Sequence, residues 1–144
     1  MNMITNATIG FLILEATNVI ALYFFPGSKY ANSVGVFKAW EKSKQYPEIH
    51  DFVKYLVNWV AGTKLIFIFL LIVILYRADD RTLVFSSAAL VISIASFFWR
   101  LFPLIRKMDR EDQIDPKHYS AVLGWMILAF ILIFLVVIFI SRGA

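Results

Sequence analysis

The chain of 144 residues contains no cysteine and only two histidines. Disulfides, thiolate metal ligands and thiol redox chemistry are therefore excluded. Charged residues make up 17% of the sequence, whereas soluble domains contain about a quarter. The net charge of +4 is small, and basic residues beside apolar segments set membrane topology more often than they bind nucleic acid. We therefore expect no nucleic-acid partner.

The motifs of common catalytic sites are also absent from the sequence. It has no Gly-x-Ser-x-Gly elbow, no phosphate-binding glycine loop, no dinucleotide fingerprint and no His or carboxylate cluster with metal-ligand spacing. We accordingly predict no catalytic residues, no metal and no cofactor. An enzyme is the less favoured interpretation.

Apolar residues are abundant, at 60% of the chain, and they lie in long blocks. Blocks of about 20 apolar residues are typical of helices that cross a membrane. We predict a single all-α integral membrane domain with four transmembrane helices in an antiparallel bundle, at about residues 4–25, 56–76, 82–102 and 119–140. The longest of these helices is expected to begin at Pro47, before the membrane.

Two of these apolar segments contain charged residues near their centres. Glu15 and Asn18 share one face of the first segment, and Lys64 lies 12 residues before Tyr76, about 18 Å along a helix. A charge at that depth is costly and usually marks a functional site. We predict a ligand- or proton-binding site at Glu15, Asn18 and Lys64, with Asn58 nearby. The alternative is a polar contact that only stabilises helix packing. Lys64 either pairs directly with Glu15 or extends its side chain toward the first loop.

Other residues suggest contacts with lipid or between helices. The aromatic and basic first loop predicts a short helix that either lies in the membrane interface, with Trp40 at the lipid headgroups, or packs on the bundle. Arg100, at the end of the third segment, is a second candidate for headgroup contact. Small residues at steps of three and four in that segment predict close helix packing: Ser86, Ala89, Ser93 and Ser96.

The distribution of basic residues predicts the topology. Loops 26–55 and 103–118 and their flanks contain ten lysines and arginines, whereas the opposite side contains Arg77, Arg81 and Arg142. By the positive-inside rule, both loops are cytoplasmic and both termini lie outside.

This arrangement is similar to that of the small membrane glutathione-transferase superfamily, which also has four spans, a basic first cytoplasmic loop and outside termini. The superfamily's Arg-x-x-x-Asn-x-x-Glu pattern is missing, since the second span offers Asn58 without that arginine or glutamate. No site residue is therefore carried over from the resemblance.

The sequence leaves three functions open. The first is binding or transport of a small polar solute, ion or lipid around Glu15, with membrane lipids as partners and a homo-oligomer as the expected assembly. The alternative is a non-catalytic membrane scaffold or regulatory subunit whose cytoplasmic loops dock a protein partner. The third is a small membrane enzyme that acts on a lipophilic substrate.

Overall fold

A computed structural model describes residues 3–143 of the chain, and every named element within them is helical. The three longest helices begin at Met3, Pro47 and Tyr119, and shorter elements lie in the first loop and the third segment. In order, the elements are α1 (Met3–Phe24), η1 (Val34–Val36), α2 (Lys38–Ser43), α3 (Pro47–Arg77), α4 (Asp80–Ala95), α5 (Phe97–Arg110) and α6 (Tyr119–Gly143).

The four predicted apolar helices are present. Four helical segments are long and apolar enough to cross a membrane: Met3–Phe24, Pro47–Arg77, Asp80–Arg110 and Tyr119–Ser141. As expected, α3 begins with Pro47 in its first turn, where the missing N–H costs no hydrogen bond. Its 31 residues exceed the predicted span 56–76 because the first turns continue beyond the apolar stretch.

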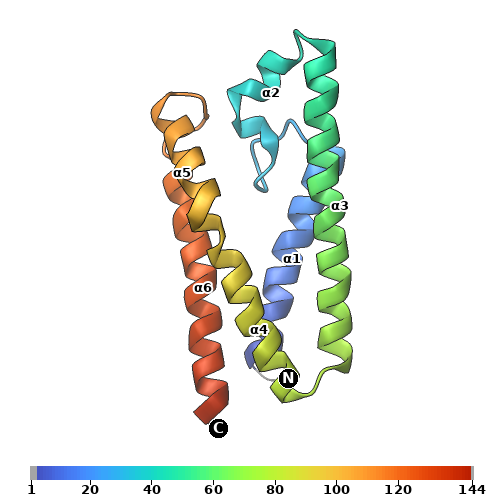
Figure 1. The fold of residues 1–144 in the computed structure, drawn as a ribbon, viewed down its shortest axis with the longest axis vertical. Helices are drawn as coiled ribbons and strands as arrows, with labels where there is room; N and C mark the ends of the chain where they lie inside the picture. Colours follow the sequence, from blue (N-terminus) through green and yellow to red (C-terminus); the bar gives the residue numbers. More distant parts are fainter. Residues whose placement is uncertain (1–2, 144) are drawn as a thin grey trace.

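The long helices alternate in direction along the chain. In Figure 1, α1 rises from the N-terminal end, α3 descends, α4 and α5 rise again, and α6 descends, so the N and C labels lie at the same end. The first loop and the segment between α5 and α6 lie at the other end. Helix α1 contacts α3, α4 and α6, so the charged middle of α1 lies among the other helices.

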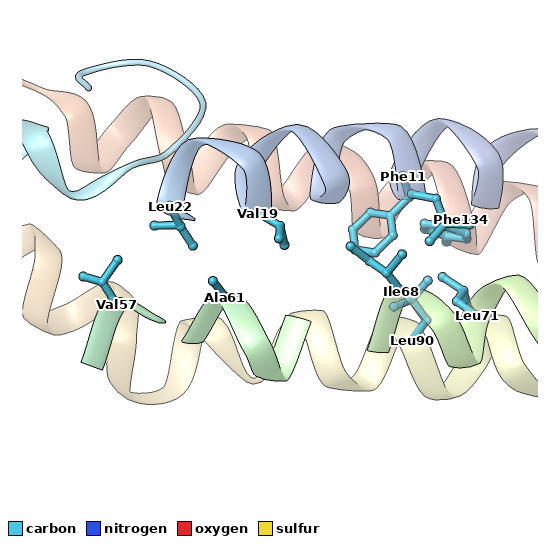
Figure 2. Packing of buried hydrophobic residues seen from close by; sticks show 10 residues of the cluster. Phe11, Val19, Leu22, Val57, Ala61, Ile68, Leu71, Leu90 and Phe134 are labelled. Atoms are coloured by element: carbon cyan, nitrogen blue, oxygen red, sulfur yellow. The ribbon is translucent and has the colours of Figure 1, made fainter. Parts of the chain in front are cut away.

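The main core lies where α1 meets α3 and α6. Figure 2 shows Leu22 of α1 facing Val57 of α3, Val19 facing Ala61, and Phe11 near Ile68. Later residues of α3 thus contact earlier residues of α1, as in an antiparallel helix pair. The same register places Glu15 opposite Lys64. Phe11 packs edge-on against Phe67, Phe130 and Phe134, with ring centres 5.5–6.1 Å apart, a favourable arrangement for aromatic rings.

The third segment forms two helices in place of the single span predicted at 82–102. Helix α4 ends at Ala95 and α5 begins at Phe97. Beside this break, the Ser93 hydroxyl donates to the Ala89 carbonyl, and the Ser96 hydroxyl donates to the Ser93 carbonyl. Serine hydroxyls that bond the preceding turn bend helices, which accounts for the break.

The predicted small-residue stripe does not mediate packing within the chain. Ala89, Ser93 and Ser96 are exposed and Ser86 is half-buried, while α4 buries Leu83, Ser87 and Leu90. Leucine side chains reach farther into the core than serine or alanine, and they determine which face of α4 turns inward.

The first and third loops dock on each other and form a loop cap, defined here as residues 26–46 and 111–118. The Lys38 amide donates to the Gln113 carbonyl at 2.9 Å, and the Asp115 amide donates to the Val36 carbonyl at 2.8 Å. Lys38 pairs with Asp112 at 2.7 Å, and Lys29 pairs with Asp115. Beneath these contacts lies a second apolar cluster, made of Val36, Ile105, Ile114 and Leu123.

Trp40 lies inside this cap, contrary to its predicted place at lipid headgroups. The expected loop helix is present as α2, but it packs on α3, and Trp40 is only 5% exposed. The centres of the Trp40 and His50 rings lie 4.8 Å apart with the ring planes tilted by 55°, and a Cβ at Gly27 would lie 3.0 Å from Trp40 Nε1. Gly27 therefore permits the close approach that buries this indole.

Candidate functional site

The Glu15–Lys64 contact expected from matching depth is present. Lys64 Nζ lies 2.8 Å from Glu15 Oε2 and 2.6 Å from Asn18 Oδ1. Both charged side chains are about three-quarters buried, with exposed fractions of 27% for Lys64 and 23% for Glu15. Glu15 and Asn18 are one helical turn apart on α1, so one ammonium group spans both acceptors.

Asn18 links this pair to the first loop. Its side-chain nitrogen donates to the Ala31 carbonyl at 2.6 Å and to the Asn32 carbonyl at 2.9 Å. The Asn18 amide therefore donates two hydrogen bonds through its nitrogen and accepts one through its oxygen. Because those bonds fix the amide, its oxygen must point toward Lys64.

The loop residues that receive Asn18 have an unusual backbone. Ala31 and Asn32 both have φ values near +54°, in the left-handed region that asparagine tolerates better than alanine. The Asn32 side chain accepts a hydrogen bond from the Tyr119 hydroxyl at 2.6 Å. A continuous polar chain thus runs from Lys64 on α3, through Asn18 and the loop, to the first turn of α6.

These groups line one side of a cavity of about 350 Å³ between α1, α6 and the first loop. The polar side includes Glu15, Asn18, Lys64, Lys29 and Asn32, together with Tyr119. The opposite wall is apolar and comes mainly from α6: Val122, Leu123, Met126, Ile127 and Phe130. Leu14, Val122 and Met126 are exposed, so the cavity opens sideways from the bundle.

Asn58 does not belong to this site. It is exposed on α3 and does not line the cavity. Asn58 lies six residues before Lys64, about 240° around a helix of 3.6 residues per turn. The two side chains therefore leave α3 in different directions, and the expected role of Asn58 is wrong.

Arg100 is exposed, and its guanidinium lies 5.9 Å from the centre of the Trp99 ring. Its contact with lipid headgroups stays a prediction. Among residues 3–143, no group of three His, Asp or Glu side chains is arranged to hold a metal ion.

Sequence reasoning missed Asn32 and Tyr119. Asn32 follows the Pro26-Gly27 turn signal, and asparagine is common where φ is positive, so a loop turn was readable there. Its contact with Tyr119, 87 residues later, had no local signal.

The sequence matches no protein-family model, no curated protein and no solved structure. The function is therefore inferred from the geometry of the site.

Proposed function

We propose that the chain inserts into a membrane as an antiparallel four-helix bundle and binds a small amphipathic molecule in the cavity beside Lys64. The observation that carries the proposal is the Lys64 ammonium, which holds Glu15 and Asn18 together at the wall of that cavity. A charged pair that only fastened two helices would need no adjoining cavity.

The Lys64 ammonium supports a polar head with a hydrogen-bond acceptor. An ammonium group has three N–H donors, and Glu15 and Asn18 accept two hydrogen bonds from it. Within the described chain, Lys64 has no third partner. Since water is scarce at membrane depth, an unmet donor there is costly. A carboxylate, carbonyl or ester oxygen of a ligand would satisfy it.

The α6 wall supports an apolar body for the same ligand. Met126, Ile127 and Phe130 of α6 belong to the apolar lining of the cavity. The volume of about 350 Å³ falls at the small end of ligand sites in proteins. A head at Lys64 and a short chain along α6 would fill both parts of the cavity, entering past the exposed Leu14 and Val122.

The proposed orientation places the loop cap in the cytoplasm and both termini outside. The two basic loops lie at one end of the molecule and bind each other, as loops on the same side of a membrane would. These mutual contacts also use surface that a docking partner would need, so they favour ligand binding over the scaffold alternative.

Transport of the ligand across the membrane is the second candidate. The Glu15 carboxylate favours it, because protonation of a carboxylate at this depth can be coupled to ligand binding. Four helices enclose little interior, so we expect a transport path to require a homo-oligomer.

Photolabelling tests the binding proposal. The full chain in phosphatidylcholine nanodiscs is incubated with decanoic acid that carries a diazirine near its chain end. We expect saturable labelling that unlabelled decanoic acid competes away. Met126→Trp should reduce it about tenfold or more by filling the cavity, because a tenfold loss needs only about 1.4 kcal/mol. Leu132→Trp, an exposed α6 control outside the cavity, should leave labelling unchanged.

A second probe tests the polar head. The same diazirine chain with a methyl group in place of the carboxyl group should label without saturation. Labelling by the acid that never saturates, or that is equal in Met126→Trp and Leu132→Trp, would contradict the proposal.

A further inference from the structure

A second amphipathic groove lies between α5 and α6, and it shares no lining residue with the Lys64 cavity. It consists of two adjoining cavities of about 450 Å³ and 320 Å³. Both are lined by Arg106 of α5 and by Ser120 and Ala121 of α6. We refer to the two cavities together as the α5–α6 groove.

The end of the groove nearest the loop cap is cationic. Arg106, Arg110, Lys117 and His118 line it. Arg106 and Arg110 are exposed and stand one turn apart on α5. Neither guanidinium has an ion pair or hydrogen bond with another described residue.

The two acidic residues at this end have partners other than the two arginines. The Asp109 carboxylate accepts hydrogen bonds from the amides of His118 and Ser120 and from the Ser120 hydroxyl. Asp112 pairs with Lys38 at 2.7 Å and with Lys117 at 3.6 Å. The two arginines therefore remain available to an external anion.

The other end of the groove is apolar. Phe98, Phe102, Gly124, Trp125 and Leu128 line it, over about two helical turns. A Cβ at Gly124 would lie 2.7 Å from the Phe102 ring, so the glycine lets α5 and α6 approach closely beneath the groove. This apolar lining is suited to a hydrocarbon chain.

We propose that the α5–α6 groove binds an anionic phospholipid, with its phosphate at Arg106 and Arg110 and an acyl chain between Phe98 and Trp125. Arginine forks match phosphate oxygens in geometry and charge. Basic pockets between helices at the cytoplasmic face bind anionic lipid headgroups. A free phosphate would use the arginines alone, whereas a phospholipid uses both ends of the groove.

Native mass spectrometry of the full chain, released from mixed micelles with equal phosphatidylglycerol and phosphatidylcholine, tests this assignment. We expect retained phosphatidylglycerol to exceed phosphatidylcholine by about tenfold. Arg106→Gln with Arg110→Gln should abolish the preference. The matched control, Arg77→Gln with Arg81→Gln, removes two exposed arginines from the opposite end and should preserve it. Equal loss in both double variants, or survival of the preference without Arg106 and Arg110, would overturn the proposal.

Two further arms distinguish a bound phospholipid from a bound free anion. Ala121→Trp fills the groove without changing charge, and it should lower phosphatidylglycerol retention as the arginine variant does. Glycerol 3-phosphate carries the phosphate without the chains and should not displace the lipid at equal concentration. Displacement by it would identify a free-anion site and overturn the lipid assignment, as would unchanged retention in Ala121→Trp. Circular dichroism of each variant checks that the helices are intact.

Discussion

Lys64 and the arginine pair Arg106 and Arg110 are cations in opposite circumstances. Lys64 is three-quarters buried and bonded to Glu15 and Asn18, whereas both arginines are exposed without a described partner. The buried ammonium had to have its acceptors supplied by the protein, because few others exist in the apolar interior. The exposed guanidiniums needed none, because water can satisfy them. We therefore expect the fold to depend on Lys64 and not on Arg106 or Arg110.

The largest effect is expected from removal of the buried cation. Lys64→Met leaves Glu15 without its ammonium partner and should destabilise the chain by about 3 kcal/mol. Thermal and denaturant unfolding in a mild detergent measures the loss. Lys54→Met, on the same helix but in an exposed pair with Asp51, should change stability by less than about 0.5 kcal/mol. Similar losses in both variants would show that the interior pair has no special role.

Exchanging the charges at positions 15 and 64 tests whether the two side chains are in direct contact. Glu15→Lys combined with Lys64→Glu restores the ion pair, and it should recover part of the stability that each single change removes. Full recovery is not expected, because a carboxylate at position 64 would face the Asn18 oxygen, and the amide cannot turn while it donates to Ala31 and Asn32. No recovery at all would argue against direct contact between positions 15 and 64.

The next effect concerns Asn18. Asn18→Leu removes an acceptor of Lys64 and leaves the Ala31 and Asn32 carbonyls without their donor, which should cost about 2 kcal/mol. Asn58→Leu makes the same chemical change at an exposed position and should be near neutral. The difference between their unfolding midpoints measures the contribution of the site. Equal midpoints would show that the loop does not need this link.

The sequence predicted the Glu15–Lys64 pair, because that prediction depends only on how deep each residue lies in its apolar segment. Hydropathy locates Glu15 and Lys64 within their segments, and two opposite charges at similar depth need one another. It could not predict that Asn18 would hold the loop, because the Ala31 and Asn32 carbonyls exist in every peptide and leave no side-chain signature. Helical spacing alone already places Asn58 and Lys64 on different faces of α3.

The loop cap was predicted least well. Its contacts join residues 74 and 86 positions apart, and charged loops leave no periodic pattern to indicate pairing. Trp40 was misjudged for a related reason: aromatic residues beside lysines are typical of membrane surfaces, but Gly27 made room for this one inside. The small residues on α4 were periodic, yet the larger Leu83 and Leu90 determined its buried face.

The exposed ion pairs of the cap give a smaller effect that depends on pH. The Lys38 ammonium beside Asp112 holds the pKa of that carboxyl below its usual value, and Lys29 does the same for the pKa of Asp115. Lowered folded-state pKa values mean that the pairs stabilise the cap above the ordinary aspartate pKa of about 3.9. The contribution is lost as the pH falls below that value through the folded-state pKa values.

The unfolding midpoint of Asp112→Asn with Asp115→Asn, compared with the unaltered chain, measures this contribution. The gap between the two midpoints should be present at pH 6 and should close as the pH falls below about 4. A gap that stays constant down to pH 3 would mean that the two carboxylates do not act through their charge.

The smallest effect is expected on the exposed side of the comparison. Arg106→Gln should change the free energy of unfolding by less than about 0.5 kcal/mol, as exposed residues without partners do. Unfolding in detergent without added phospholipid measures it. A loss as large as that of Lys64→Met would show that Arg106 is part of the fold, and the contrast between the two cations would fail.

The position of the photolabel on the chain tests the central claim most directly. In the unaltered protein labelled with the diazirine decanoic acid, peptide mass spectrometry should find the crosslinks on Val122, Met126 and Phe130 of α6 and on Phe11 and Leu14 of α1, which line the Lys64 cavity. Crosslinks confined to Leu132, Val136 and Phe139, which are exposed on α6 outside the cavity, would contradict a binding site beside Glu15 and Lys64.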